Sequence, residues 1–411
     1  MNHDFFQNLT HNVFKPLLLF FYFGFLIPIL KVRFEFPYVI YQGLTMYLLL
    51  AIGWQGGEEL AKVQPADIDN IAEFVALGFV LNFVIGALTY LLLRYLTPLR
   101  RVDRATIAGY YGSDSAGTYA TCVAVLTGLH IAYNAYMPVA LAFMEIPGCL
   151  LALYLVARLR HRGMDEAGFM PDEPGYKAPA KVGPGAATGV GRTESDDAPE
   201  RGTEEELEFS LEKLEHPDWE PGPSAPRPKG KRVPLFSRQI FQEVFLNPGI
   251  VLLLGGIAIG FIGALQGQKV VHDQNELFVA AFQGVLCLFL LEMGMTASRK
   301  LRDLRSAGTG FIFFGLLAPI LFGALGILVA YPFTYLTDTH FQPGTYVLFA
   351  VLCGSASYIT LPAVQRLGIP EASPTLPLAA SLGLTFSVAV TIGIPLYIEI
   401  NRVVAHWFPG T

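Results

Sequence analysis

Long apolar runs separated by short polar connections occupy most of this chain. A helix that crosses the hydrocarbon core of a bilayer needs about 20 mostly apolar residues. Five such runs precede a long polar gap and five follow it. The ten predicted spans are Phe14–Leu30, Pro37–Trp54, Ile71–Leu96, Val102–Leu129, Ala135–Leu159, Pro248–Leu265, Leu277–Ala297, Gly308–Tyr331, Thr345–Leu367 and Leu376–Val403. The pattern predicts an all-α polytopic membrane protein with ten transmembrane helices.

The composition points the same way. Hydrophobic residues make up 53% of the chain and charged residues only 15%, whereas soluble domains carry charge on about 25% of their residues. The net charge of −6 gives no reason to expect nucleic-acid binding. No phosphate-binding loop, metal-ligand spacing or nucleophile elbow occurs in the sequence, so we expect neither an enzyme nor a resident cofactor.

The polar gap divides the chain into three parts. It is rich in Pro, Gly, Glu and Lys and has few aliphatic residues, so it cannot bury a core and is predicted to be largely disordered. We expect a first five-helix repeat over residues 1–160, a linker over 161–236 and a second five-helix repeat over 237–411.

Lys and Arg residues cluster in every second connection, which predicts the orientation in the membrane. If these connections are cytoplasmic, the linker is also cytoplasmic and both termini lie outside. The residues that carry the bias are Lys31, Arg33, Arg94, Arg100, Arg101, Arg104, Arg158, Arg160, Arg162, Arg299, Lys300, Arg302, Arg305 and Arg366.

An odd number of spans in each half means that the second half enters the membrane upside down relative to the first. The sequence also contains a repeat: residues 112–118 and 354–360 both read G-S-x-S-x-x-T, and each lies in the fourth span of its half. Two inverted repeats are the architecture of many secondary transporters. The pattern therefore favours a transporter built from two inverted five-helix repeats.

The repeated motif destabilises the interior of a helix, because Gly is flexible and the Ser side chain competes for backbone hydrogen bonds. We expect crossing helices four and nine to be broken there. Half-helix N-termini suit an anion, and unwound carbonyls and hydroxyls suit Na⁺. Close helix packing is the alternative for any single small residue. The predicted substrate-binding residues are Gly112, Ser113, Ser115, Thr118, Gly354, Ser355, Ser357 and Thr360.

Three carboxylates lie within or at the edge of apolar spans, where an ionised group is costly and usually faces a polar cavity. Asp114 lies inside the first motif, and Glu145 lies just before Pro147. We predict sodium binding by Asp114, Ser115, Glu145 and Ser357. For Glu292, an ion pair with the basic residues that follow it is as reasonable as a transport role.

Several stretches resemble the sodium-dependent bicarbonate transporter superfamily of bacterial inner membranes. They are the two motifs, Met144–Pro147, Leu291–Gly294, Ser355–Ala363, Ile369–Pro374, Leu384–Phe386 and Ile392–Tyr397. The resemblance implies the ten-span inverted fold with a core and a gate domain, a homotrimer, and uptake of bicarbonate with Na⁺ as coupling ion. It also implies a cytoplasmic PII-like partner that closes the transporter. Asp114 departs from the small apolar residue expected there.

Two other functions are consistent with these residues. With Asp114 in the motif, the cargo could be another small solute moved with Na⁺ or H⁺. Alternatively, the chain could be a membrane receptor or regulatory scaffold that signals through residues 161–231 without transport.

Overall fold

The computed structural model describes residues 15–64, 68–134, 136–177, 238–304, 307–337, 339 and 341–408. All regular secondary structure within these ranges is helical. Six helical stretches in the described part are long and apolar enough to cross a membrane: Ile68–Leu96, Met137–His161, Pro248–Gln266, Lys269–Arg302, Thr309–Thr337 and Leu376–Ala405. The shorter helices Pro16–Ile29 and Pro343–Gly354 are also apolar. These features are those of a multi-pass membrane protein.

The first half contains seven described helices, and two of its predicted spans are divided. The helices are α2 (Pro16–Ile29), α3 (Tyr38–Leu60), α4 (Ile68–Leu96), α5 (Arg101–Tyr111), α6 (Ala116–Gly128), α7 (Met137–Met144) and α8 (Ile146–His161). The predicted fourth span is α5 and α6, separated by four residues outside the helix. The predicted fifth span is α7 and α8, which meet at Glu145, two residues before Pro147.

The second half has corresponding elements, together with π-helical turns that the sequence pattern did not predict. Its helices are α10 (Arg238–Phe245), α11 (Pro248–Gln266), α12 (Gln268–Asn275), η2 (Glu276–Ala280), α13 (Phe282–Asp303), α14 (Thr309–Thr337), α15 (Pro343–Gly354), α16 (Thr360–Gly368), α17 (Leu376–Ala379), η4 (Ala380–Phe386), η5 (Ala389–Gly393) and α18 (Ile394–Ala405). The predicted ninth span is α15 and α16, again interrupted. The predicted seventh span starts earlier than expected, because α12 and η2 continue it backward to Gln268.

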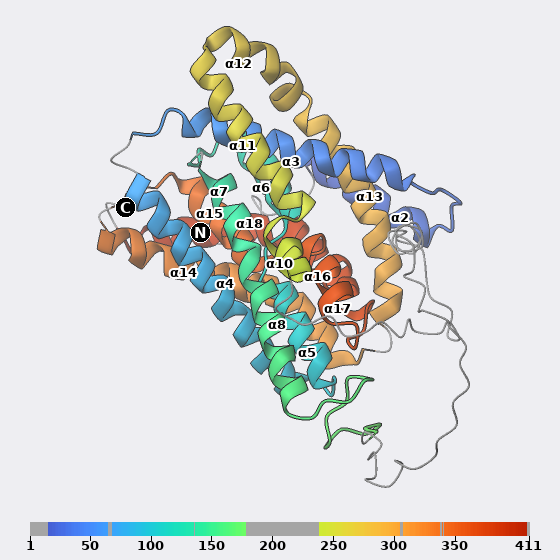
Figure 1. Ribbon diagram of the computed structural model, residues 1–411. Helices are drawn as coiled ribbons and strands as arrows, with labels where there is room; N and C mark the ends of the chain where they lie inside the picture. The colour runs from blue at the N-terminus through green and yellow to red at the C-terminus, as the bar shows by residue number, and fades with distance from the viewer. Residues whose placement is uncertain are drawn as a thin grey trace, which may run out of the picture.

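The two most extensive helix–helix packings each join one helix from each half: α3 with α11, and α2 with α13 (Figure 1). Small residues allow both contacts. A Cβ atom on Gly57 would lie 2.0 Å from the carbonyl oxygen of Ile257, and one on Gly260 would lie 2.2 Å from that of Trp54. A Cβ atom on Gly294 would lie 2.2 Å from the carbonyl oxygen of Phe21. The Gly256-x-x-x-Gly260 pattern is therefore a helix-packing face.

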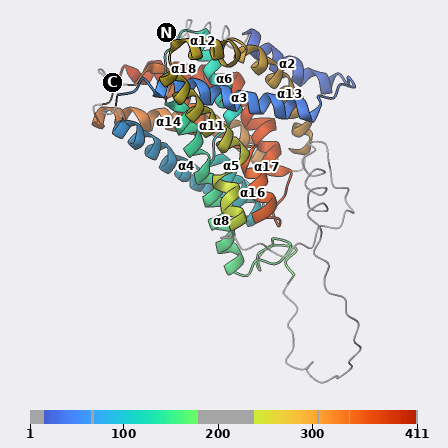
Figure 2. The same ribbon diagram turned by 45° about the horizontal axis from the view of Figure 1, so that its top comes forward.

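The remaining long helices form a second group around the broken spans. α5 packs against α4 and α8, while α15 packs against α14 and α18. α6 contacts α15, and α16 contacts α5, so the broken helices of the two halves lie against each other. Figure 2 shows α5, α8 and α16 together, apart from α2, α3 and α13.

The first residues of the predicted linker are folded. Residues 162–177 turn back from α8 and pack on the N-terminal end of α5, where Met164 and Met170 are buried. The Asp165 carboxylate accepts hydrogen bonds from the backbone N–H groups of Ala167, Phe169 and Lys177. Burial alone would raise the pKa of the Asp165 carboxyl, but these bonds hold it below its ordinary value. The rest of the predicted linker, and Arg305, lie outside the described residues.

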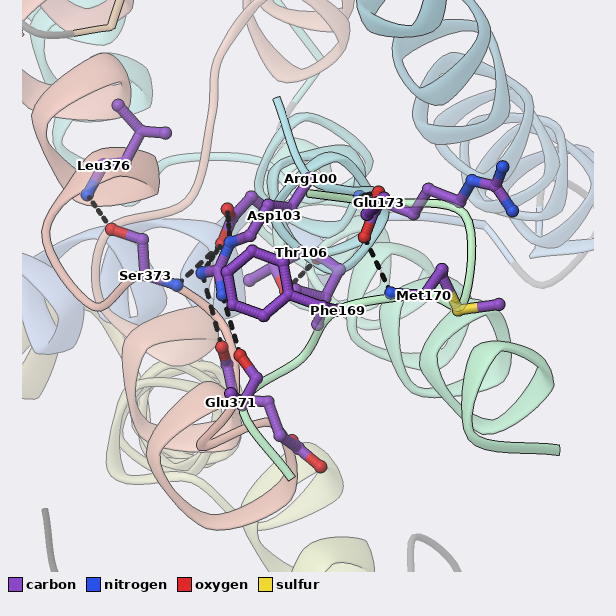
Figure 3. Close-up of polar contacts among 12 residues, drawn as sticks. Arg100, Asp103, Thr106, Phe169, Met170, Glu173, Glu371, Ser373 and Leu376 are labelled. Carbon is purple, nitrogen blue, oxygen red and sulfur yellow. Dashed lines mark hydrogen bonds and ion pairs between the residues drawn. The ribbon is translucent and has the colours of Figure 1, made fainter. Parts of the chain in front are cut away.

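A network of ion pairs joins this segment to the connection between α16 and α17 (Figure 3). The Arg100 guanidinium donates to both oxygens of Asp103 at 2.7 and 2.9 Å, and to the Ala167 carbonyl at 2.8 Å. Asp103 also accepts from the backbone N–H of Ser373 at 2.8 Å. The Arg160 guanidinium donates to both oxygens of Glu371 at 3.0 and 2.7 Å. We call these four side chains, Arg100, Asp103, Arg160 and Glu371, the basic-end network.

Candidate functional site

The first break lies between α5 and α6 and contains Gly112, Ser113, Asp114 and Ser115. Ser115 has an extended backbone (φ −138°, ψ 114°), and its hydroxyl oxygen accepts from the backbone N–H of Thr118 at 3.3 Å. It is therefore the N-cap of α6, a position that Ser favours. The Thr118 hydroxyl donates to the same oxygen at 3.0 Å. The positive end of the α6 dipole thus begins inside the protein, at the break.

The second break lies between α15 and α16. Ser355 is extended, and its hydroxyl turns back to the Leu352 carbonyl at 3.4 Å. The Ser357 hydroxyl oxygen accepts from the backbone N–H of Leu361 at 3.5 Å, in the first turn of α16. The two Ser residues of this motif thus differ: Ser355 bonds to the half-helix before it, and Ser357 accepts a bond from the first turn of the half-helix after it.

The two breaks meet. The backbone N–H of Ser357 donates to the carbonyl of Tyr110, in the last turn of α5, at 2.9 Å. The Tyr358 hydroxyl lies against α6, where a Cβ on Gly117 would be 2.0 Å from it. Two motifs more than 200 residues apart in sequence are therefore in direct contact. The predicted interruptions at 112–118 and 354–360 are both present, and they are adjacent.

Glu145 connects both breaks. Its carbonyl accepts from the Ser113 hydroxyl at 2.6 Å, and its carboxylate accepts from the Thr360 hydroxyl. The neighbouring carbonyl of Met144 accepts from the Asn82 side-chain amide at 2.9 Å. Contacts from α4, from the first break and from α16 thus converge on the α7–α8 junction. Glu145 therefore contacts the first motif through its backbone carbonyl and the second motif through its side chain.

Asp114 has a different environment from Glu145. Its side chain is only 1% exposed, and neither carboxylate oxygen has a hydrogen-bond partner within the described structure. It lies close enough to Glu145 for the two charges to interact. In the described part of the chain, no Lys, Arg or His forms an ion pair with either carboxylate. A buried carboxylate without a partner is strongly unfavourable unless it is protonated or coordinates a cation.

The site also includes two residues that the sequence did not single out. The Ser381 hydroxyl lies 2.8 Å from the carbonyls of both Ala356 and Ser357, and the Thr385 hydroxyl lies 2.6 Å from that of Tyr111. Both side chains come from the π-helical segment η4. π-Helical turns inside helices occur often at functional sites. The small residues Ala379, Ala380 and Gly383 around Ser381 were the available signal.

The geometry supports two kinds of ligand. The N-termini of α6 and α16 present positive dipole ends and N–H groups, which favour an anion. The carboxylates of Asp114 and Glu145, with the hydroxyls and carbonyls of the breaks, are hard oxygen donors that favour a cation such as Na⁺. The break residues are almost completely buried: Ser113, Ser115, Thr118, Ser355, Ser357 and Thr360 are each at most 3% exposed. These break residues are shielded from solvent, whereas Glu145 is partly exposed.

Comparison with known proteins assigns the chain to a family. The family model of the Na⁺-dependent bicarbonate transporter superfamily matches residues 16–402. The chain belongs to this superfamily. No curated protein matches the sequence. Membership agrees with the resemblance drawn from the motifs, and it identifies the protein as a sodium-dependent transporter and not an enzyme.

For this superfamily member, the structure gathers most of the predicted site into one place. Glu145 is hydrogen-bonded to both Ser113 and Thr360, and Ser357 is bonded to the end of α5 through the Tyr110 carbonyl. Glu292 lies in α13, and its carboxylate accepts from the Thr296 hydroxyl at 2.8 Å. Whether each residue binds Na⁺ or substrate remains a prediction.

Proposed function

We propose that this protein is a symporter that carries bicarbonate, or a closely similar small anion, together with Na⁺ through the site at the two helix breaks. The contact of Glu145 with both breaks supports this proposal most directly. A cation bound between Glu145 and Asp114 would neutralise the two carboxylates. The N-termini of α6 and α16 could then attract an anion that the empty site repels. Coupling follows, because the anion binds well only after the cation.

In this proposal the ligands divide between the two ions. Asp114, Glu145, Ser115 and Ser357 would hold Na⁺, while the hydroxyls and N–H groups of Gly112, Ser113, Thr118, Gly354, Ser355 and Thr360 would face the anion. The exchanged pairing of helices, α3 with α11 and α2 with α13, is what two inverted five-helix repeats would produce. We therefore propose the ten-span inverted fold, with helices four and nine as its crossing broken helices.

The proposed setting is a bacterial inner membrane, with both termini outside and the linker in the cytoplasm. The Lys/Arg distribution supports this orientation. Family resemblance supports a homotrimer and a PII-like cytoplasmic regulator. The orphaned Asp114 carboxylate favours one alternative, in which H⁺ or a second cation travels with another small solute.

Uptake of labelled bicarbonate into proteoliposomes, with Na⁺ and bicarbonate varied independently, tests the proposal. The wild-type protein should require both an inward Na⁺ gradient and bicarbonate. Thr360→Val removes the hydroxyl that contacts Glu145 while keeping its shape, and should lower uptake about tenfold or more, as expected for a lost bond to a charged group. Thr97→Val is a matched control, because its hydroxyl donates only to Leu93 in its own helix. Uptake that is independent of Na⁺ would refute the coupling.

Ser357→Leu tests the location of the site. A bulky apolar side chain between Tyr110 and Ser381 should abolish uptake in protein that still purifies as a folded species. Normal uptake by this variant would remove the two breaks from the transport path. The same assay with Na⁺ replaced by a proton gradient separates the alternative cargo from the main proposal.

A further inference from the structure

A cavity of about 370 Å³ lies where the C-terminal ends of α2 and α13 meet. Its lining is unusual for so small a space, because three of its six residues are cations and none is acidic. The lining residues are Ile27, Pro28, Lys31, Val32, Arg299 and Arg302. We call this cavity the α2–α13 pocket. None of its lining residues belongs to the two helix breaks or to the transport site described above.

Local backbone geometry directs these cations to the pocket. After α2 ends at Ile29, Lys31 adopts a left-handed conformation (φ 56°), which is unfavourable for a non-glycine residue. The N–H of Val32 closes the turn by bonding to the Ile27 carbonyl at 3.2 Å, as in a Schellman cap. Glycine is the usual residue at such a position. Here a Lys occupies it, and the turn brings its side chain to the end of α13.

The two arginines reach across from α13 to the same turn. The Arg302 guanidinium donates to the Pro28 carbonyl at 3.3 Å, and that of Arg299 donates to the Phe34 carbonyl at 3.2 Å. These bonds fix the positions of the guanidinium groups. Neither Lys31 nor Arg302 forms an ion pair with a carboxylate of the described chain. The turn after α2 and the bonds from α13 therefore hold three positively charged side chains at the pocket.

Exposed apolar side chains lie next to Lys31 along the chain. Leu26, Ile29, Leu30 and Val32 are 47%, 55%, 67% and 54% exposed. In a membrane protein such exposed side chains contact acyl chains, whereas cations at the helix ends lie at the level of the headgroups. The lining of the pocket thus combines three cationic side chains with apolar ones. A soluble anion would use the cations alone, whereas a phospholipid would use both the cations and the apolar side chains.

We propose that the α2–α13 pocket binds the phosphate headgroup of an anionic phospholipid, with its acyl chains lying over the exposed face of α2. Basic pockets between transmembrane helices on the cytoplasmic side are suited to such headgroups. The volume accommodates a headgroup but not a whole lipid. A bound lipid would bridge α2 and α13 and so stabilise one of the two main contacts between the halves. The proposal does not depend on which ion the transporter carries.

The experiment measures thermal stability and lipid retention of the purified full-length protein. Phosphatidylglycerol and phosphatidylcholine are titrated separately into detergent micelles, and inorganic phosphate is tested in a third series. Bound lipid is counted by native mass spectrometry. We expect phosphatidylglycerol to raise Tm and to remain bound, and phosphatidylcholine to do neither. Inorganic phosphate at the same concentration should have little effect, because it lacks the acyl chains.

Variants locate the site. Lys31→Gln combined with Arg302→Gln should weaken phosphatidylglycerol binding about tenfold or more, since each cation near a headgroup contributes on the order of 1 kcal/mol. Arg101→Gln is the matched control at the same end of the protein, because Arg101 is already paired with Asp172. Lys31→Arg keeps the charge and should bind like wild type, which separates lost binding from misfolding.

Three results would overturn the proposal. If phosphatidylglycerol and phosphatidylcholine raised Tm equally, the net charge of the headgroup would not determine binding. Unchanged phosphatidylglycerol binding by the double variant would place the lipid elsewhere. A Tm increase from inorganic phosphate as large as that from phosphatidylglycerol would show a site for a soluble anion instead.

Discussion

Two pairs of carboxylates differ in their partners: Asp103 and Glu371 in the basic-end network, and Asp114 and Glu145 at the helix breaks. In the basic-end network, Asp103 and Glu371 each accept two hydrogen bonds from one arginine guanidinium. At the helix breaks, Asp114 has no partner in the described structure, and Glu145 has a threonine hydroxyl. The two carboxylates of the basic-end network are each paired with an arginine of the same chain. A carboxylate whose partner is missing from the chain is available for a cation from solution.

This comparison predicts that mutations in the two groups affect different properties of the protein. Loss of a network residue should lower stability, because it leaves a buried charge without its partner. Loss of a site carboxylate should change ion binding and leave the stability of the Na⁺-free protein almost unchanged. The following experiments test that contrast, from the largest expected effect to the smallest.

Arg160→Met should have the largest effect. It leaves Glu371, whose side chain is only 3% exposed, without its guanidinium partner. Breaking a buried pair in this way costs roughly 3–5 kcal/mol, measured as the free energy of unfolding or as a large fall in Tm. The double variant Arg160→Met, Glu371→Leu should recover most of the loss. If the single variant is as stable as wild type, the network does not hold the two segments together.

Glu145→Gln should affect ion binding more than stability. A bond to a charged group contributes about 1.5–3 kcal/mol, so the Na⁺ concentration for half-maximal effect should rise roughly 10- to 100-fold. Na⁺ stabilises the protein if it binds only the folded state, so the Na⁺-dependent rise in Tm reports binding without a transport assay. Glu399→Gln, in the middle of α18 and paired with Arg402, serves as a control. An unaltered Na⁺ response would exclude Glu145 as a ligand.

Asp114→Asn sharpens the comparison further, because the change removes charge and keeps shape. If Asp114 shares the cation with Glu145, the variant should need about tenfold more Na⁺ in the same Tm assay, with Tm in the absence of Na⁺ equal to or above that of wild type. The alternative outcome is informative. Faster bicarbonate uptake at unchanged Na⁺ dependence would show that this carboxylate opposes the anion and belongs to another cargo.

Asp165→Asn should have the smallest effect on stability. Asp165 is a third kind of carboxylate, whose charge is stabilised by hydrogen bonds from backbone N–H groups. Because its pKa is lowered in the folded protein, its contribution to stability is complete above the pKa of the unfolded chain and disappears as the pH falls through the lower folded-state pKa. The variant should lose about 1 kcal/mol at neutral pH and none at strongly acidic pH. Unfolding followed at several pH values checks this; a difference that persists at acidic pH would contradict it.

Much of this arrangement could be predicted from the sequence, and the reasons differ from place to place. The breaks at 112–118 and 354–360 were predictable because Gly and Ser in apolar spans weaken helices locally. Glu145 could be singled out because an ionised carboxylate in an apolar span is costly and usually faces a polar cavity; its role in ion binding stays a prediction. Ser381 was not, since its role depends on a π-helical turn and on carbonyls contributed by a distant segment. The folding of residues 162–177 was also missed, because its stability comes from Arg100 and from backbone hydrogen bonds, not from an apolar run.

The glycine crossings of α3 with α11 and of α2 with α13 bear on how the protein is made. During translation, α2 and α3 enter the bilayer long before their partners exist, and the backbone surfaces at Gly24 and Gly57 must face lipid or the insertion machinery until α13 and α11 arrive. Assembly of these pairs therefore waits for synthesis of the second half. A ribosome that stalls within the central segment would release a fragment whose tightest contacts can never form, and such a fragment should be a substrate for membrane proteases.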